Sequence, residues 1–262
     1  MIIDFHTHIF PEKIAQRTIE FLASVCKTDP YTDGTSQGLT ASAKEAGVDV
    51  SVALPIVTKP SQFESINRFA SGFQEGRILS FGGIHPAQEN YKEQLRQIKS
   101  MGMKGIKLHP DYQDIRFNDI RCKRVVSYAS ELGLIVSVHA GRDPKCPEDV
   151  HCTPQMAAEV IREVEPEKLV LAHMGGNLLW DEVEEYLAGR QVYFDTGVVL
   201  DAMEEEQFLR IVRAHGADKI LFATDSPWAG QKEFIDILSG MALTDREKEQ
   251  ILGGNGRRLL GI

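Results

Sequence analysis

The residues best suited to chemistry in this chain are two histidines near its amino terminus, in the run Met1-Ile2-Ile3-Asp4-Phe5-His6-Thr7-His8. The run is short and apolar before the histidines, a pattern that predicts a β-strand. Side chains two residues apart on a strand point to the same face, so both imidazoles would converge where the strand ends. Converging imidazoles can bind a divalent metal. An isolated His-x-His is more often a surface or packed pair, so the rest of the chain must decide.

Further metal-capable residues recur at the ends of later apolar runs. Six of the eight histidines lie at or beside such ends, whereas a histidine that serves only the core would be expected inside a run. The relevant run ends are Gly83-Ile84-His85-Pro86, Lys107-Leu108-His109-Pro110, Val138-His139-Ala140-Gly141, Ala172-His173-Met174-Gly175-Gly176, Phe194-Asp195-Thr196-Gly197 and Thr224-Asp225-Ser226-Pro227.

The elements that must position these residues alternate along the chain. Short apolar runs rich in β-branched residues are each followed by an amphipathic stretch of helical periodicity, which predicts parallel strands with helical crossovers. Eight such units close a (β/α)8 barrel of the α/β class, in which the carboxyl ends of the strands form the mouth where chemistry is built. No linker divides the chain, so we expect one domain over residues 1–262; an open doubly wound sheet is the structural alternative. The expected strands are Met1–His6, Val48–Pro55, Ile78–His85, Gly105–His109, Leu134–His139, Leu169–His173, Val192–Thr196 and Ile220–Asp225.

Composition limits the partners that this protein can have. The 262 residues are 42% hydrophobic and 26% charged, with a net charge of −9 from 29 basic and 38 acidic residues. An acidic balance disfavours nucleic acid and anionic membranes, so we expect a small-molecule substrate. The four cysteines form no C-x-x-C pair, the first residues read as a strand rather than a secretory signal, and no run has the length of a membrane span. We therefore expect a cytoplasmic protein with reduced thiols.

Taken in order, the motifs resemble the amidohydrolase superfamily, and within it the amidohydrolase 2 (amidohydrolase-related) group. The resemblance extends from Asp4-Phe5-His6-Thr7-His8 to the closing residues 255–261 and includes Gly105-Ile106-Lys107-Leu108-His109-Pro110, His139, Ala172-His173-Met174-Gly175-Gly176 and Thr224-Asp225-Ser226-Pro227-Trp228. Each motif is weak alone, and the five in this order are specific. The resemblance implies a metal-dependent (β/α)8 barrel that hydrolyses amides, esters or lactones, with non-oxidative decarboxylation in some branches.

The resemblance also implies roles for particular residues. His6, His8, His139 and Asp225 match the metal ligands, and Asp225 also matches the carboxylate that exchanges a proton with the nucleophilic water. His173 matches a histidine that orients this water or binds a second metal. Imidazole and carboxylate ligands suit zinc first, with manganese or iron(II) as alternatives, and zinc lowers the pKa of bound water to about 7. One divalent ion is expected, and a second would follow if Lys107 were carboxylated as a bridge between two ions.

Four residues near the predicted mouth are candidates for binding substrate: His109, Tyr112, Arg142 and Trp228. Lys107, if it stays a free ammonium, is a further one. Arg142 follows His139 and could hold a carboxylate through its planar guanidinium. Cations crowded near a metal repel unless an anion joins them, so we expect a compact carboxylated substrate.

Two other functions and one assembly state remain open at this point. A metal-dependent decarboxylase of an aromatic or enoic acid belongs to the same superfamily, but its branches usually carry longer insertions, and this compact chain favours hydrolysis. A nuclease like the TatD group shares the opening His-x-His and Gly83-Ile84-His85-Pro86, yet that group has a glutamate where this chain has Lys107. Barrels of this type often pair, so a homodimer is a further expectation.

Overall fold

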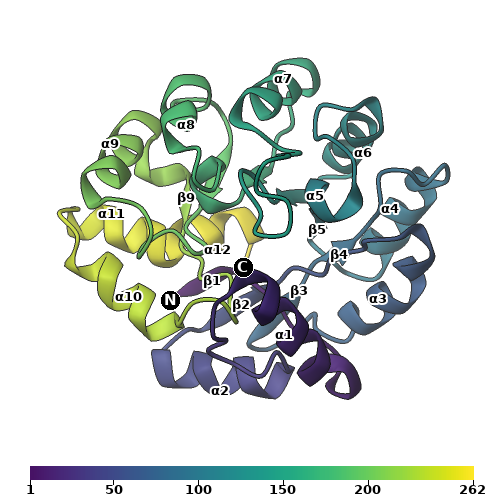
Figure 1. Ribbon diagram of the computed structural model, residues 1–262, viewed down its shortest axis with the longest axis horizontal. Helices are drawn as coiled ribbons and strands as arrows, with labels where there is room; N and C mark the ends of the chain where they lie inside the picture. The colour runs from purple at the N-terminus through teal and green to yellow at the C-terminus, as the bar shows by residue number, and fades with distance from the viewer.

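The computed structural model describes residues 1–262 and shows parallel strands enclosed by a ring of helices (Figure 1). The predicted α/β architecture is confirmed: strands and helices alternate along the whole chain. The strands form two sets in which each strand pairs in parallel with the next along the chain, in the orders β1-β2-β3 and β4-β5-β6-β7-β8-β9. The strands are β1 Ile3–Thr7, β2 Val50–Ala53, β3 Ile78–Ser80, β4 Gly82–Gly83, β5 Gly105–Leu108, β6 Ile135–Val138, β7 Leu169–Leu171, β8 Tyr193–Asp195 and β9 Ile220–Leu221.

The third predicted strand, Ile78–His85, is divided into β3 and β4. Between them, the Phe81 amide donates to the carbonyl of Ala53 (2.9 Å), continuing the pairing with β2. Gly83 instead exchanges two hydrogen bonds with the side-chain amide of Asn67, at 2.9 and 2.8 Å. The side chain satisfies backbone groups that a neighbouring strand would otherwise pair, so β3 and β4 together act as one stave of the barrel.

The last and first strands close the barrel. The Phe5 amide donates to the carbonyl of Phe222 (2.9 Å), and the Asp225 amide donates to the carbonyl of His6 (2.8 Å). The buried carboxylate of Asp4 reinforces this seam, because it accepts from the amide and the hydroxyl of Thr224 at 3.0 and 2.6 Å. Counting β3 and β4 as one stave, the barrel has the eight staves that the alternation predicts.

The helices form the outer layer and bury a continuous apolar core against the strands. A smaller cluster that includes Ile3, Phe5 and Val52 fills the barrel interior. No helix has the length and apolarity required to cross a membrane. The helices are α1 Glu12–Cys26, α2 Ser36–Ala46, α3 Phe63–Ala70, α4 Tyr91–Ser100, α5 Pro110–Gln113, α6 Ile120–Glu131, α7 Pro154–Val164, α8 Trp180–Tyr186, α9 Glu205–His215, α10 Gln231–Gly240, α11 Asp245–Glu249 and α12 Asn255–Leu260.

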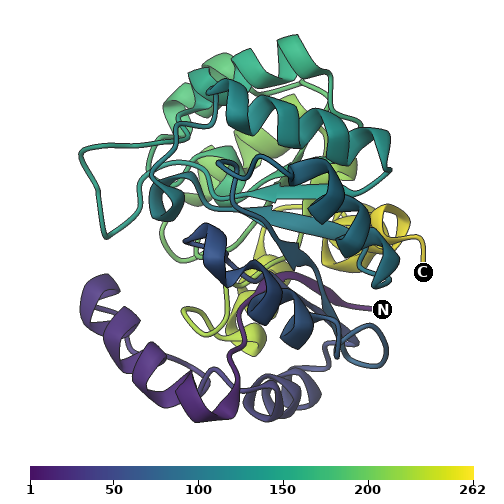
Figure 2. The same cartoon turned by 90° about the vertical axis from the view of Figure 1, so that its right-hand side faces the viewer.

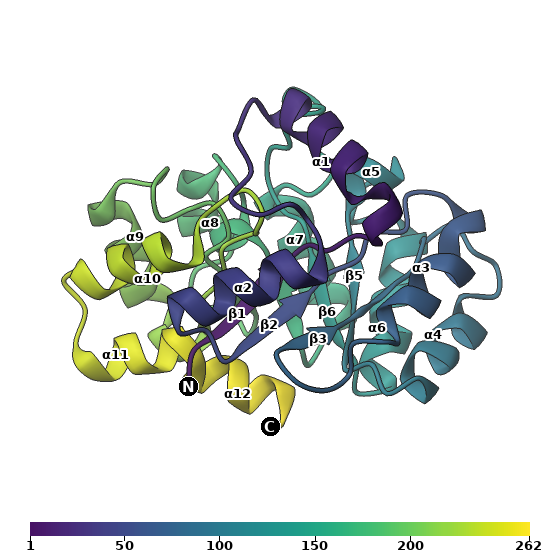
Figure 3. The ribbon, with the colours of Figure 1, turned by 90° about the horizontal axis from the view of Figure 1, so that it is seen from below.

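Helix α1 departs from the barrel pattern. It stands out from the ring of helices, on the side of the molecule away from both chain termini (Figure 2, Figure 3). Only Ala15 and Ile19 of this helix are buried, and Phe21 is 65% exposed. Because β1 runs from the terminal side toward α1, this helix lies at the mouth of the barrel, above the carboxyl ends of the strands.

Candidate metal centre

The first half of the site consists of His6, His8 and Asp225, which the β1–β9 seam brings together. His6 is buried, and its Nδ1 lies 3.0 Å from Asp195 Oδ2. His8 Nδ1 lies 2.9 Å from the carbonyl oxygen of Leu54. Both partners are acceptors, so each Nδ1 carries the proton and each Nε2 carries a lone pair. The two histidines of the opening motif therefore present the same nitrogen to the same place.

Asp225 completes this half of the site. Its Oδ1 lies 3.3 Å from His6 Nε2 and 2.9 Å from His8 Nε2, yet the atom is buried without a hydrogen-bond partner of acceptable geometry. Burial alone would raise the pKa of Asp225, but His6 and His8 outweigh it and hold the pKa well below its usual value. Three lone-pair atoms converge here, and Lys107 Nζ, 3.1 Å from His6 Nε2, is the proton donor that contacts them. Two imidazole nitrogens and a carboxylate oxygen form a donor set that suits a divalent cation.

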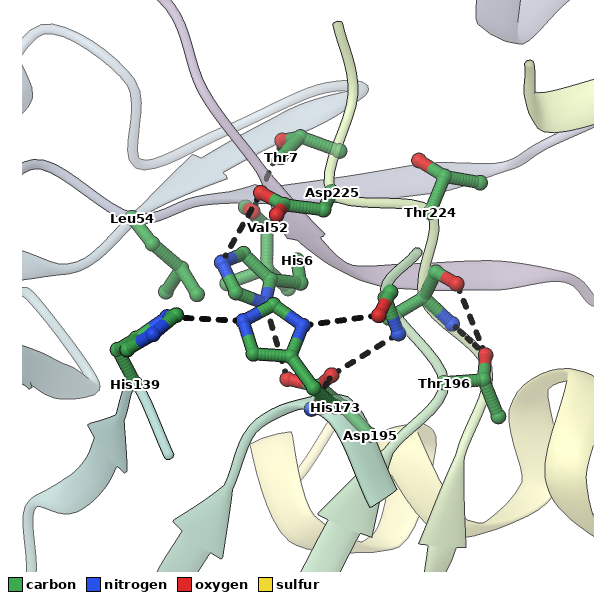
Figure 4. Close-up of polar contacts among 12 residues, drawn as sticks. His6, Thr7, Val52, Leu54, His139, His173, Asp195, Thr196, Thr224 and Asp225 are labelled. Atoms are coloured by element: carbon green, nitrogen blue, oxygen red, sulfur yellow. Dashed lines mark hydrogen bonds and ion pairs between the residues drawn. The ribbon is translucent and has the colours of Figure 1, made fainter. Parts of the chain in front are cut away.

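The second half consists of His139 and His173, at the ends of β6 and β7 (Figure 4). His173 Nδ1 lies 2.8 Å from the carbonyl oxygen of Gly197, and its Nε2 lies 3.0 Å from His139 Nδ1. Donation to Gly197 leaves the lone pair of His173 on Nε2, facing His139. Burial, together with nearby His109, lowers the pKa of His139 well below its ordinary value, so its imidazole is neutral and carries one lone pair.

Asp195, at the end of β8, joins the two halves. One oxygen contacts His6 Nδ1, and the other accepts from the amides of His173 and Gly197, each at 3.0 Å. Burial alone would raise its pKa, but His6 outweighs burial and lowers the pKa to about 2, so the carboxylate is ionised. The sequence analysis located Asp195 at a strand end and gave it no role. Its position among the other polar strand ends was the signal that could have identified it.

Backbone strain is concentrated at the same place. His173, Val198 and Asp225 have φ angles of 58°, 49° and 62°, in the left-handed region that non-glycine residues rarely adopt. Each such residue costs on the order of 1–3 kcal/mol and persists only where surrounding contacts impose it. Here the Asp225 amide donates to His6 O and the Val198 amide donates to Thr224 O (3.2 Å). The strained residues surround the candidate centre, as is common at functional sites.

Lys107, on β5, lies beneath the first half of the site. It is fully buried, its Nζ is 3.1 Å from His6 Nε2, and no carboxylate lies within 4.0 Å of it. Burial lowers its pKa to about 8. A lysine that is easily neutralised suits the bridging role, because an amine must be uncharged to take up a carboxylate. Direct substrate binding is less well supported, because Lys107 does not reach the cavity at the mouth.

A stack of three rings forms one wall of the site. The Tyr112 ring packs on His109 with centroids 4.0 Å apart, and His109 packs on His139 with centroids 4.2 Å apart and planes 6° apart. Pro110 ends β5, as expected, and His109 becomes the cap of α5, with its Nδ1 accepting from the Tyr112 amide at 3.4 Å. His109 therefore has a structural duty in addition to its place in the stack.

Above the two halves lies a cavity of about 300 Å³. Tyr112 and Trp228 line it, as predicted, whereas His109 lies behind Tyr112 and is not exposed to it. Leu22 and Cys26 of helix α1 form part of the wall, so this helix at the mouth of the barrel borders the cavity. The lining residues are His8, Phe10, Leu22, Cys26, Thr28, Ile56, Tyr112, His139, Asp143, Pro144, His173, Asn177, Leu178, Val198, Ala202, Asp225, Pro227 and Trp228.

The structure does not place Arg142 in this cavity. Its guanidinium donates to the carbonyl of Pro147 (3.1 Å), and its side chain is 40% exposed. The cause is the backbone after β6: Gly141 pairs with Asn177, which directs Arg142 outward and leaves Asp143 at the cavity wall. Burial raises the pKa of Asp143 to about 6. His85 also lies outside the cavity, where its Nδ1 accepts from the Ala87 amide and shapes a turn.

The fold and the site together define a class: (β/α)8-barrel proteins with a candidate His/Asp metal centre at the mouth. The chain belongs to the amidohydrolase family, whose model matches residues 3–262, and it is an enzyme of the amidohydrolase-related group. The resemblance drawn from the motifs is thereby confirmed. A comparison with curated protein sequences finds no match.

Solved structures share the fold at low sequence identity. An uncharacterised TIM-barrel protein from Bordetella bronchiseptica aligns with a TM-score of 0.79 and 17% identity, covering 99% of this chain and 98% of that one. The 2,6-dihydroxybenzoate decarboxylase from Rhizobium aligns with a TM-score of 0.75 and 15% identity, covering 99% and 98%. The 5-carboxyvanillate decarboxylase from Novosphingobium aromaticivorans, whose structure contains manganese, aligns with a TM-score of 0.78 and 12% identity, covering 100% and 96%. These likenesses confirm the barrel.

Proposed function

We propose that this enzyme is a metal-dependent hydrolase that cleaves an amide, ester or lactone bond in a small molecule. The observation that carries the proposal is the convergence of His139 Nδ1 and His173 Nε2 at 3.0 Å, beside the set formed by His6, His8 and Asp225. Hydrolysis gains from a group that positions or activates water, and His173 Nε2, beside His139 and the metal-capable set, is placed to do this. Membership of the amidohydrolase family supports the same reaction class.

The donor set fits a divalent metal. His6, His8 and Asp225 would hold it, with His139 completing the set, and nitrogen and oxygen donors of this kind suit zinc, manganese or iron(II). When bound, the metal would supply Lewis acidity and a water molecule that ionises near neutral pH. The manganese of the carboxyvanillate decarboxylase structure is consistent with this set.

The protein residues supply proton transfer and positioning. Asp225 is ionised and would accept a proton from the attacking water, then return it to the leaving group. His173 keeps its lone pair on Nε2 and would hold the water in line or, with a second ion present, ligate that ion. Lys107 would bridge two ions if carboxylated. Asp195 would fix the position of the His6 ring relative to the turn at His173, because its carboxylate bonds His6 Nδ1 and the His173 amide.

The cavity restricts the substrate. Its volume of about 300 Å³ matches the lower end of the range for small-molecule sites and is too small for a polymer. None of its lining residues is lysine or arginine, and Asp143 adds a carboxylate to the wall. The predicted clamp for a substrate carboxylate is therefore missing from the wall. We propose a small, largely apolar and uncharged substrate that packs against Tyr112 and Trp228.

Decarboxylation is the second candidate, supported by the two decarboxylases among the similar structures. The compactness of this chain does not argue against it, because the alignments span 98% and 96% of those decarboxylases. A nuclease is less well supported, because no lysine or arginine lines the cavity to bind a phosphodiester backbone.

Isotope transfer separates the two leading candidates. The protein loaded with zinc, manganese or iron(II) would be screened against amides, esters, lactones, phosphodiesters and aromatic carboxylates in H₂¹⁸O. We expect one ¹⁸O atom in the acid product and no release of CO₂, with Asp225→Asn as the inactive control. Release of CO₂ without ¹⁸O in the product, accompanied by deuterium on carbon in D₂O, would replace hydrolysis with decarboxylation.

A further inference from the structure

Two carboxylates converge on the nitrogen of His139 that faces away from His173. Asp111 Oδ2 and Asp143 Oδ2 each lie 3.9 Å from His139 Nε2. All three residues are at least nine-tenths buried, with 5%, 5% and 6% of their surfaces exposed for Asp111, Asp143 and His139. Asp111 Oδ2 and His139 Nε2 have no hydrogen-bond partner. Buried polar atoms without partners are rare and need an explanation.

The proposed function supplies that explanation, and the inference rests on it. If His139 binds the metal through Nδ1, the single proton of its neutral imidazole must be on Nε2. This nitrogen is buried away from bulk solvent, so its proton needs an acceptor within the site, either directly or through a single bound water. We propose that Asp111 and Asp143 are positioning residues that hold His139 in the Nε2–H form and so present its Nδ1 lone pair to the metal.

The opposite tautomer is disfavoured by the same contacts. With the proton on Nδ1, His139 would donate to His173 Nε2 and turn the Nε2 lone pair toward two carboxylate oxygens. The His139 lone pair would then face both carboxylates, and the one proton at hand would be that of His109 Nε2, which lies 3.7 Å from Asp143 Oδ2 and leaves Asp111 Oδ2 without a donor, so this form is electrostatically unfavourable. Metal binding at Nδ1 and the carboxylates behind Nε2 therefore favour the same form. Carboxylate–histidine–metal relays commonly work in this way.

Each carboxylate is anchored through its other oxygen. Asp111 Oδ1 accepts from the amide of His151 (3.1 Å) and contacts Cys146 Sγ (3.6 Å). Asp143 Oδ1 accepts from the amide of Lys145 (2.8 Å). Backbone amides of the loop after β6 thus hold both carboxylates: Asp143 lies on this loop, and Asp111 packs against it. Their Oδ2 atoms therefore stay directed at His139.

The remaining gap of 3.9 Å is longer than a direct hydrogen bond. The His139 ring is held flat against His109, so its plane is fixed and only a small in-plane shift or one bridging water is needed to close the gap. Both routes require the same proton on Nε2. The tautomer, rather than the exact length of the contact, is therefore the quantity to measure.

The direct test is a long-range ¹H–¹⁵N correlation spectrum of the zinc-loaded protein labelled at histidine, with His139 assigned from the signal lost in His139→Asn. We expect the Nε2–H pattern for His139. An Nδ1–H pattern in the zinc form would overturn the proposal. Because the tautomer is read from the wild-type protein, the answer does not depend on whether the Asp111 and Asp143 variants fold.

The second test is zinc affinity, measured by competition with a chelator. Asp111→Asn and Asp143→Asn keep the side-chain shape and should each lower the affinity by about 10- to 100-fold, the usual effect of removing a partner behind a metal-bound histidine. Asp149→Asn is the matched control, because Asp149 is on the same loop but pairs with Arg116 and His151; its affinity should not change.

The visible spectrum of the cobalt-substituted protein should shift in the two test variants and stay constant in the control. Unchanged affinity and spectrum in both test variants would overturn the positioning role. Neither readout depends on turnover, so a protein that binds zinc with His139 as Nε2–H but hydrolyses nothing would remove the proposed function alone. A protein that binds no divalent metal would remove both.

Discussion

The two halves of the site differ in how firmly the protein holds them. In the first half, the nitrogen of each histidine that points away from the centre bonds an acceptor at 2.9–3.0 Å, from Asp195 for His6 and from Leu54 for His8. In the second half, His173 is held in the same way, with Nδ1 2.8 Å from the carbonyl oxygen of Gly197, whereas the nitrogen of His139 that points away has only Asp111 and Asp143, each at 3.9 Å. The histidines of the first half are therefore already held in position, whereas the contacts behind His139 must shorten when the metal binds.

The difference follows from which elements build each half. His6 and Asp225 belong to adjacent strands whose backbones hydrogen-bond across the barrel seam, so closing the barrel already brings them together. His139 depends on the turn after β5 and on the loop after β6 for its carboxylate partners. Loops tolerate movement that barrel strands do not, because fewer backbone contacts restrain them. We therefore expect the first half to contribute more to metal binding than His139 does, and His173 of the second half to govern turnover.

The largest effect is expected from removing a ligand of the first half. His6→Ala or Asp225→Asn should lower metal affinity by more than about 100-fold, beyond the range for residues behind the ligands. The barrel should remain folded, because the seam uses the backbone of these residues. Metal content by atomic spectroscopy and circular dichroism would check both parts. Full metal content in a triple His6, His139 and Asp225 variant would contradict the assignment of this centre.

The next effect concerns the second half. His173→Asn should lower kcat by about 100-fold or more, the scale for a positioned acid or base. If one ion binds per chain, that loss should occur with the metal retained, and steady-state kinetics beside metal analysis would show it. Loss of one of two ions would instead identify His173 as a ligand. Wild-type kcat in His173→Asn would contradict the expectation that His173 governs turnover.

Asp195 offers a smaller perturbation of the first half. Asp195→Asn keeps the shape but weakens the acceptor for His6 Nδ1–H, so metal affinity should fall by about 10- to 100-fold. The same change disturbs the amides of His173 and Gly197 and should reduce stability by about 1–3 kcal/mol. Chelator competition and urea unfolding would measure the two effects. Unchanged metal affinity in Asp195→Asn would show that the bond from His6 to Asp195 does not support metal binding by the first half.

His215 is a reference for a buried histidine outside the site. It stacks on Phe194, accepts from the Gly189 amide through Nδ1 and contacts the carbonyl of Val192 through Nε2, so both nitrogens are satisfied. Burial lowers its pKa to about 4 from the ordinary 6.5. The unfolded chain therefore binds this proton at a higher pH than the folded protein does.

The stability supplied by neutral His215 is thus complete above pH 6.5 and is lost progressively as the pH falls toward 4. Between pH 7.5 and 5.5 the loss should be about 1 kcal/mol. His215→Gln should remove that part of the pH dependence when urea unfolding of both proteins is compared across this range. Parallel pH profiles for the two proteins would show that His215 titrates normally.

Much of the site could be predicted from spacing, because it depends on strand ends. In this barrel each strand ends at the mouth whatever its neighbours are. The alternation of apolar runs therefore predicted the strand-end residues, which are His6, His8, His139, His173 and Asp225. Tyr112 and Trp228 were predicted from the loops that follow the strands. Arg142 could not be placed in this way. Its direction depends on the pairing of Gly141 with Asn177, a contact between residues far apart in the sequence.

The sequence by itself determined the barrel, the family and the side chains that meet at the mouth, because hydrophobic periodicity and residue identity are local properties. Only the tertiary structure decided which nitrogen of each histidine faces the centre. That choice depends on Asp195, Leu54, Gly197, Asp111 and Asp143, whose atoms approach the histidines across the fold. It also decided that the cavity wall carries a carboxylate and no cation, because side-chain direction on a loop is set by contacts that no local pattern encodes.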